Sequence, residues 1–170
     1  MLIGIDASRA ARSERTGTEN YAWHLIRGLL ALYSPHRFRL YYAQPPPAGL
    51  FDSRAGTHST SSAAQSGASG SEPRAETRVL PPPRLWTHLG LGTEMLRHPP
   101  DVLFVPAHVL PLIHPRCSVV TIHDLGHHYF PGAHTFAQRR YLEWSTRFAV
   151  RRAARIIAVS RSARDDLIRL

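Results

Sequence analysis

Short apolar runs alternate with longer amphipathic stretches along most of the chain. The runs are rich in β-branched side chains, as is typical of strands buried on both faces of a parallel sheet. They predict strands at residues 2–5, 38–43, 78–80, 101–105, 118–122 and 156–159. Because strands alternate with helices, the sequence predicts an α/β fold with a Rossmann-like, mostly parallel sheet flanked by helices.

The longer stretches carry apolar side chains every three or four residues, which predicts amphipathic helices. We expect these helices at residues 18–33, 85–97, 136–154 and 160–170. One face of the first helix would hold Tyr21, Leu25, Leu29 and Leu32. Ser160 is the candidate N-cap of the last helix. That helix reaches Leu170 with no Gly, Asn or Pro to close it, so we expect the protein to continue beyond this residue.

One segment consists mostly of small and polar residues, which cannot build a hydrophobic core. Fifteen of the seventeen residues from 55 to 71 are Ala, Gly, Ser or Thr, and prolines flank them at 45–47 and 73. Such a stretch buries too little apolar area to offset the entropy lost on ordering. We therefore predict one domain, residues 1–170, with a disordered low-complexity insertion at 45–78 that is dispensable for folding.

Charge and cysteine content narrow the function classes. All 21 basic side chains are arginine, against 12 acidic ones, and the net charge is +9. Arginine pairs bidentately with phosphate and carboxylate, so the excess favours anionic partners, although a GC-rich coding bias explains it equally well. Cys117 is the only cysteine, which excludes a disulfide-rich scaffold and a multi-cysteine zinc site.

The sequence pattern predicts neither a signal peptide nor a transmembrane segment. The start, from Met1 to Asp6, has no basic region before its apolar residues. The longest nearly apolar run, residues 102–113, contains two prolines and a histidine and is shorter than the roughly 20 residues of a spanning helix. We therefore predict no transmembrane segment and a cytoplasmic location.

Ligands of open parallel sheets bind beyond the carboxyl ends of the strands, so the residues that follow each run are candidates. The first candidate place follows the first strand and runs from Asp6 to Asn20. Within it, residues 15–19 precede a helix whose N-terminal amides could meet a phosphate or an anionic acceptor. Gly17 would allow close backbone approach, and an ordinary turn explains it as well. The sequence contains neither G-x-G-x-x-G nor a P-loop motif.

A second candidate place follows the run at residues 118–122. His123 and Asp124 are adjacent ionisable groups at a strand tip, where they are placed to contact ligand. Together with His127 and His128 they could bind a metal ion, so metal-dependent hydrolysis is an alternative function. The β-branched run and Gly126 favour strand and loop over a helix with ligands four residues apart, so we predict no metal site.

The third place is the arginine-rich C-terminal stretch. Residues 134–170 hold nine arginines and three acidic side chains, and the helix at 136–154 interleaves arginines with four aromatic residues. This composition is typical of an interfacial helix on anionic lipid, and a solvated helix face is the alternative. No nucleic-acid module accompanies the charge, so we predict no nucleic-acid partner.

Five short motifs occur in an order that is more specific than any one of them. Taken together they resemble the N-terminal domain of family 4 glycosyltransferases. The motifs are Ile3-Gly4-Ile5-Asp6, Arg15-Thr16-Gly17-Thr18-Glu19-Asn20-Tyr21, Val119-Val120-Thr121-Ile122-His123-Asp124-Leu125, Gln138-Arg139-Arg140-Tyr141 and Ile156-Ile157-Ala158-Val159-Ser160-Arg161-Ser162.

The resemblance implies one half of a GT-B enzyme, in which two Rossmann-like domains face each other. It implies retaining transfer of a sugar from a nucleotide-sugar, a co-substrate rather than a cofactor, to a glycan or lipid-linked acceptor in polysaccharide biosynthesis. Gly17 and Thr18 would lie near the donor diphosphate and the acceptor. His123 would point at the transferred sugar and stabilise charge there, and Asp124 could orient its imidazole.

The same resemblance places the donor-binding domain outside these 170 residues. We therefore expect the chain alone to be inactive as a hexosyltransferase. The alternative from a different class is a non-catalytic Rossmann-like binding or partner module whose basic helix faces a membrane. In both cases peripheral contact with the inner face of an anionic membrane is expected.

Overall fold

The apolar runs of the sequence form one sheet of six parallel strands in the order β3-β2-β1-β4-β5-β6. The computed structural model describes residues 1–51, 75–81, 85–129 and 135–170, except for the side chains of residues 127 and 128. The strands are β1 (Leu2–Asp6), β2 (Arg37–Tyr42), β3 (Ala75–Val79), β4 (Val102–Val105), β5 (Ser118–Ile122) and β6 (Arg155–Ala158). The predicted fold class is confirmed.

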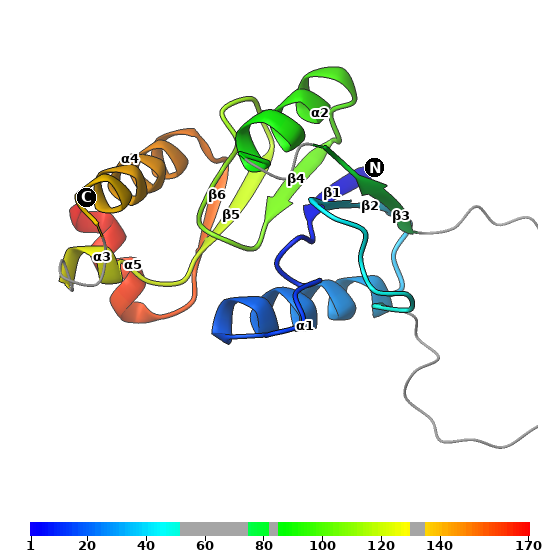
Figure 1. Cartoon of the computed structure of the whole chain (residues 1–170), viewed down its shortest axis with the longest axis horizontal. Coiled ribbons are helices and arrows are strands. Elements are labelled where there is room, and N and C mark those ends of the chain that lie inside the picture. The colour runs from blue at the N-terminus through cyan, green and yellow to red at the C-terminus, as the bar shows by residue number, and fades with distance from the viewer. Residues whose placement is uncertain (52–74, 82–84, 130–134) are drawn as a thin grey trace, which may run out of the picture.

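Helices connect these strands and cover the sheet. They are α1 (Gly17–Ala31), the π-helix η1 (Thr87–Leu91), α2 (Gly92–Arg97), α3 (Gly126–Tyr129), α4 (Phe136–Arg152) and α5 (Arg161–Arg169). Figure 1 shows α1 on one side of the sheet and α2 on the other. Ser160 caps α5 as predicted, because its hydroxyl accepts the Ala163 amide at 3.0 Å. No helix in the described ranges is long and apolar enough to cross a membrane.

Alternation along the strands divides the interior into two cores, as expected for a sheet covered on both faces. Leu40 and Tyr42 of β2 pack on the α1 side with Ile26. Tyr41 points to the opposite face and packs with Leu91 and Met95 of η1 and α2. Both cores are therefore built from the same strands.

Gly4 lets the sheet and the β3–β4 connection approach each other closely. A Cβ atom at this position would lie 2.8 Å from Pro100 Cγ and 2.8 Å from Tyr41 Cε2. Such contacts require neighbouring atoms to move. A larger side chain at position 4 would therefore require the side chains of Pro100 and Tyr41 to move.

The buried face of α1 agrees only in part with the predicted one, because Leu25 and Leu29 pack against the core as expected. Ala22 and Ile26 are fully buried, whereas Tyr21 is only half-buried and Leu32 is 58% exposed. The helix ends at Ala31, one residue before Leu32, so the predicted stripe extended past the helix. The single helix predicted at residues 85–97 is a π-helix followed by a short α-helix, and α3 lies in a segment predicted as loop.

The predicted bounds of the insertion were too wide, because residues 75–78 belong to β3 and pair with β2. The residues of β3 are mostly polar, and ion pairs hold this edge strand in place of apolar burial. Glu76 contacts Arg39 at 3.0 Å and Arg78 at 2.7 Å. Leu50 and Phe51 pack against the core on the α1 side. Residues 52–74 lie outside the described part, so the prediction of disorder is untested there.

Candidate functional site

The strand order reverses direction between β1 and β4, and this switch point lies at the centre of the sheet. Ligands of doubly wound α/β sheets bind at the carboxyl ends of the strands beside such a point. Asp6 ends β1, and His123 follows β5 on the same edge, because all strands are parallel. The carboxyl edge therefore gathers the loops that carry the candidate residues.

His123 is held by contacts from two other segments. Its Nε2 donates a hydrogen bond to the Pro106 carbonyl at 2.9 Å, which fixes the ring tautomer. The Tyr21 ring meets the imidazole edge-on, and the Tyr21 hydroxyl lies 3.3 Å from Thr121 Oγ1. The first and second candidate places of the sequence are thus neighbours in space. The His123 side chain is half-buried, so part of it is accessible.

Asp124 does not take the orienting role expected of it. Its Oδ1 accepts the Gly126 amide at 2.8 Å, and its side chain is exposed. None of the hydrogen bonds in the described residues joins Asp124 to His123. The carboxylate instead shapes the turn into α3, since a short Asp side chain bonds readily to the backbone two residues on.

Gly17 and Thr18 open α1, close to the predicted start. A Cβ atom at Gly17 would meet nothing within 4 Å, so the space beside this backbone is open. The Thr16 amide donates to Glu19 Oε2 at 3.2 Å, and Arg9 donates to Glu19 Oε1 at 3.0 Å. Burial raises the pKa of Glu19, but the hydrogen bonds from Thr16 and Arg9 outweigh it and lower this pKa to about 2. The helix start is therefore pinned to the loop that follows β1.

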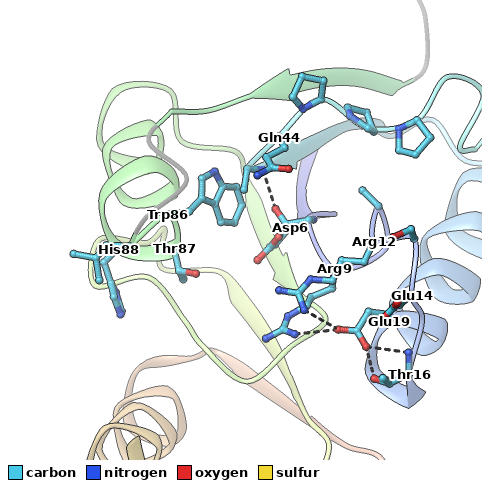
Figure 2. Close-up of a pocket in the computed structure, with 18 of the residues that line it drawn as sticks. Asp6, Arg9, Arg12, Glu14, Thr16, Glu19, Gln44, Trp86, Thr87 and His88 are labelled. Atoms are coloured by element: carbon cyan, nitrogen blue, oxygen red, sulfur yellow. Dashed lines mark hydrogen bonds and ion pairs between the residues drawn. The ribbon is translucent and has the colours of Figure 1, made fainter. Parts of the chain in front are cut away.

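A pocket of about 1160 Å³ opens between this loop and η1. Figure 2 shows its labelled side chains, with Asp6 near the middle and Trp86, Thr87 and His88 on the η1 side. The loop after β2 forms another wall with Ala43, Gln44 and residues 45–47, and Tyr141 comes from α4. None of the four residues predicted from the sequence, Gly17, Thr18, His123 and Asp124, lines it.

Asp6 is a buried carboxyl group in the wall of this pocket, only 6% exposed. Its Oδ1 accepts the Ser8 amide at 3.0 Å, and the Ser8 hydroxyl accepts the Ala43 amide at 3.1 Å. Burial raises the pKa of Asp6 to about 6, against smaller opposing effects of the Ser8 hydrogen bonds and the Arg9 charge. A carboxyl group in a pocket with a perturbed pKa is typical of a functional site.

The η1 wall of the pocket has unusual backbone geometry. Leu85 has a φ of 55°, in the left-handed region that non-glycine residues rarely occupy, and a π-helix begins two residues later. Strained residues and π-helical turns are both found often at functional sites. His88 Nε2 and the Tyr141 hydroxyl lie 2.8 Å apart, so η1 is tied to α4 at the pocket rim.

The exposed face of α4 combines aromatic and basic side chains. Tyr141 and Trp144 are 42% and 46% exposed, and Trp144 stacks on Phe148 with centroids 5.6 Å apart. Three exposed arginines lie along the same face: Arg140, Arg147 and Arg151. Because Tyr141 also lines the pocket, this face is continuous with the pocket rim.

Comparison with protein families agrees with this geometry, since the model of Glycosyltransferase Family 4 matches residues 15–170. The chain belongs to glycosyltransferase family 4. Its sheet is the Rossmann-like N-terminal domain of such an enzyme. Neither the curated proteins nor the solved structures that were compared gave a significant match.

For this glycosyltransferase domain, the first candidate place of the sequence, from Asp6 to Asn20, covers the loop that forms one wall of the pocket. The binding role expected there was assigned to Gly17 and Thr18 and not to Asp6. Asp6 ended an apolar run and could have been singled out, because a carboxylate directly after a buried strand points to the ligand edge. Trp86 and His88 gave no comparable signal. They reach the pocket only because η1 packs against the opposite face of the sheet from α1.

A metal centre finds no support among the described side chains of the domain. No group of three or more His, Cys, Asp or Glu residues within them is arranged to hold an ion. The side chains of His127 and His128 are outside the described part, so the four-residue cluster considered from the sequence is untested.

Proposed function

We propose that the chain is the acceptor-side domain of a retaining hexosyltransferase. The enzyme transfers a sugar from a nucleotide-sugar donor to a glycan or lipid-linked acceptor, in polysaccharide biosynthesis. The donor-binding domain lies outside these residues, and the chain alone is inactive. The observation that carries the proposal is His123, held at the carboxyl edge of a family 4 domain by Pro106 and Tyr21.

His123 acts on the transferred sugar through its second ring nitrogen. With the Nε2 proton donated to Pro106, Nδ1 is an acceptor that takes a hydrogen bond from a sugar hydroxyl. Its position is fixed before the substrate arrives, which is the condition for preferential stabilisation of the transition state. Asp124 supports this role indirectly, by setting the turn that follows His123.

The start of α1 contributes to binding of the donor diphosphate and the acceptor. The backbone amides of Gly17 and Thr18 stand at the positive end of a helix of 15 residues. The open space beside Gly17 lets an anionic group approach the backbone. Glu19 and Arg9 keep this turn in place, since both are engaged in one hydrogen-bonded network.

The exposed face of α4 makes peripheral contact with anionic membrane at the inner surface of the cell. Aromatic rings at this face insert at the headgroup level, and arginines attract the anionic surface. Continuity of the face with the pocket rim at Tyr141 brings the pocket close to lipid-linked acceptors.

The test is His123→Ala in the full-length enzyme. Loss of one pre-organised hydrogen bond is expected to lower turnover by about 10²–10³-fold while the protein stays folded. His24→Ala is the matched control, because His24 is exposed and its ring lies against Trp23, so its loss is expected to change turnover little. Near wild-type turnover in a folded His123→Ala enzyme would remove the assignment.

The second candidate is a non-catalytic module that binds membrane through α4. The exposed aromatic and arginine side chains of that helix favour it. It predicts vesicle binding by a protein whose full-length form transfers no sugar from any nucleotide-sugar tested. Transfer that depends on His123 would exclude it.

A further inference from the structure

The loop that follows β4 brings a second histidine beside His123. The centroid of the His108 ring lies 5.5 Å from that of the His123 ring, at an interplanar angle of 34°. Both residues are half-buried. The Pro106 carbonyl, which accepts the proton of His123 Nε2, belongs to the same loop. One segment therefore supplies both a hydrogen bond and a ring contact to the imidazole, and the proposed transfer step gives His108 no task.

The backbone of this loop is held in place from both sides of His108. β4 lies between β1 and β5 in the sheet (Figure 1), so its carboxyl end is flanked by the segments that follow those strands. Pro106 and Ala107 are buried, and Leu110 packs into the core on the η1 and α2 side. Because a close-packed interior leaves buried residues little room to shift, the His108 ring is held against His123 by the fold.

The hydrogen bond at Nε2 does not by itself decide where Nδ1 of His123 points. The side-chain torsion that turns a histidine ring has a broad energy well, so the imidazole can still rock about this bond. The Tyr21 ring stands at 89° to the imidazole, whereas the His108 ring is closer to parallel with it. Rings that meet the imidazole at such different inclinations restrict different rocking motions. The orientation of Nδ1 is therefore expected to depend on both rings.

We propose that His108 is a positioning residue, which acts through His123 and keeps Nδ1 of that imidazole directed at the transferred sugar. The inference rests on the proposed function, because that function gives Nδ1 its task. The packing surface of the His108 ring carries the effect, so another aromatic ring should replace it. Misplacing a group that stabilises the transition state lowers turnover more than it weakens substrate binding.

The kinetic test uses the full-length enzyme and whichever of UDP-glucose, UDP-galactose, UDP-N-acetylglucosamine and GDP-mannose gives wild type the highest turnover. His108→Ala should lower kcat by about tenfold, with the KM for the donor changed less than about twofold. His108→Phe should stay within about threefold of wild type, because the ring is kept. His98→Ala is the matched control, since His98 follows α2 and precedes β4, at the opposite edge of the sheet.

A double variant separates positioning from direct contact with the substrate. Residues that act through one partner are not additive, so adding His108→Ala to His123→Ala should cause no further loss of turnover. A further loss in this double variant would overturn the proposal, because His108 would then act on the substrate itself. Loss in His108→Phe as large as in His108→Ala would overturn it for the same reason.

An NMR measurement on the 170-residue chain needs no transfer reaction. Nuclear Overhauser contacts between the Tyr21 and His123 rings should weaken in His108→Ala and persist in His108→Phe and His98→Ala. Unchanged contacts or unchanged turnover in His108→Ala would overturn the positioning role. Absence of transfer by every form, wild type included, would instead remove the proposed function, and the Overhauser contacts would still decide whether His108 holds the ring.

Discussion

The ring of Tyr21, near the start of α1, stands edge-on against the ring of His123 at the tip of β5, with centroids 4.9 Å apart. The contact joins two segments that are about a hundred residues apart in sequence. It makes Tyr21 a positioning residue for the proposed catalytic histidine, because the ring limits how the imidazole can tilt.

Tyr21→Ala in the full-length enzyme is expected to lower turnover by about tenfold or more, since small misplacements of a catalytic group are costly. Tyr21→Phe keeps the ring, loses only the contact with Thr121 and should stay near wild type. Tyr33→Ala, at a fully exposed position, is the control. The NMR signals of the His123 ring should move in Tyr21→Ala and stay in place in Tyr21→Phe. Unchanged turnover and ring signals in Tyr21→Ala would contradict the positioning role.

Asp6 is expected to make the stability of the fold depend on pH. Its folded-state pKa of about 6 lies above the unfolded value of 3.8, so folding favours the protonated form. The associated stability is complete below about pH 4 and is lost as pH rises through 6. Asp6→Asn should therefore be more stable than wild type at about pH 7.5, by up to about 3 kcal/mol, and similar to it near pH 4.

Urea unfolding of the chain at both pH values checks this expectation. Glu143→Gln is a suitable control because Glu143 pairs with Arg147 on the surface of α4, where ion pairs contribute little. A stability difference between wild type and Asp6→Asn that does not change with pH would contradict the expected protonation of Asp6.

Membrane attachment through α4 is expected to depend on salt and on the aromatic face. Trp144→Ala and the double variant Arg140→Gln, Arg151→Gln should both reduce co-sedimentation with phosphatidylglycerol vesicles. Each arginine near an anionic surface contributes about 1 kcal/mol, and salt screens this attraction. The control is Arg27→Gln with Arg97→Gln, which removes the same charge from α1 and α2. If both double variants lose vesicle binding equally, net charge alone accounts for the attachment and the face of α4 does not.

Two deletions should separate the insertion from the fold. Replacing residues 52–74 by a short Gly-Ser linker should change the free energy of unfolding by about 1 kcal/mol or less, because loop-closure entropy varies slowly with length. Replacing residues 45–78 removes most of β3 and its pairing with β2, and this variant should lose most of its stability. Thermal unfolding compares the two. A large loss in the shorter deletion would show that the domain map is wrong.

Local hydrophobic patterns predicted the central strands of the sheet but misplaced the edge strand β3. The run at residues 118–122 predicted β5 at its observed bounds, because every position in it is apolar or β-branched except Ser118. β3 was placed three residues too late, since Glu76 and Arg78 are held by ion pairs that no hydrophobic pattern encodes. The predicted face of α1 was right for Leu25 and Leu29, which pack against the core, and wrong for Leu32, because the helix ends at Ala31.

The candidate site was likewise only partly accessible from sequence. His123 stood out because it follows a buried run directly. The pocket around Asp6 requires η1 to return across the sheet, and the carbonyl that holds His123 comes from Pro106, in a different loop. Such relationships depend on strand order and crossover, which the alternation of apolar runs does not specify.

The place of β1 at the centre of the sheet has a consequence for biosynthesis. This strand leaves the ribosome before β2 and can pair with it soon afterwards, Leu2 with Arg37. Its other edge stays unpaired until β4 has been synthesised, because Ile3 pairs with Val102. At about 5–20 residues per second the nascent chain spends several seconds with one side of its central strand unpaired. The β1–β3 half is therefore the stage at which a chaperone would be most useful, and β4 closes the exposed edge.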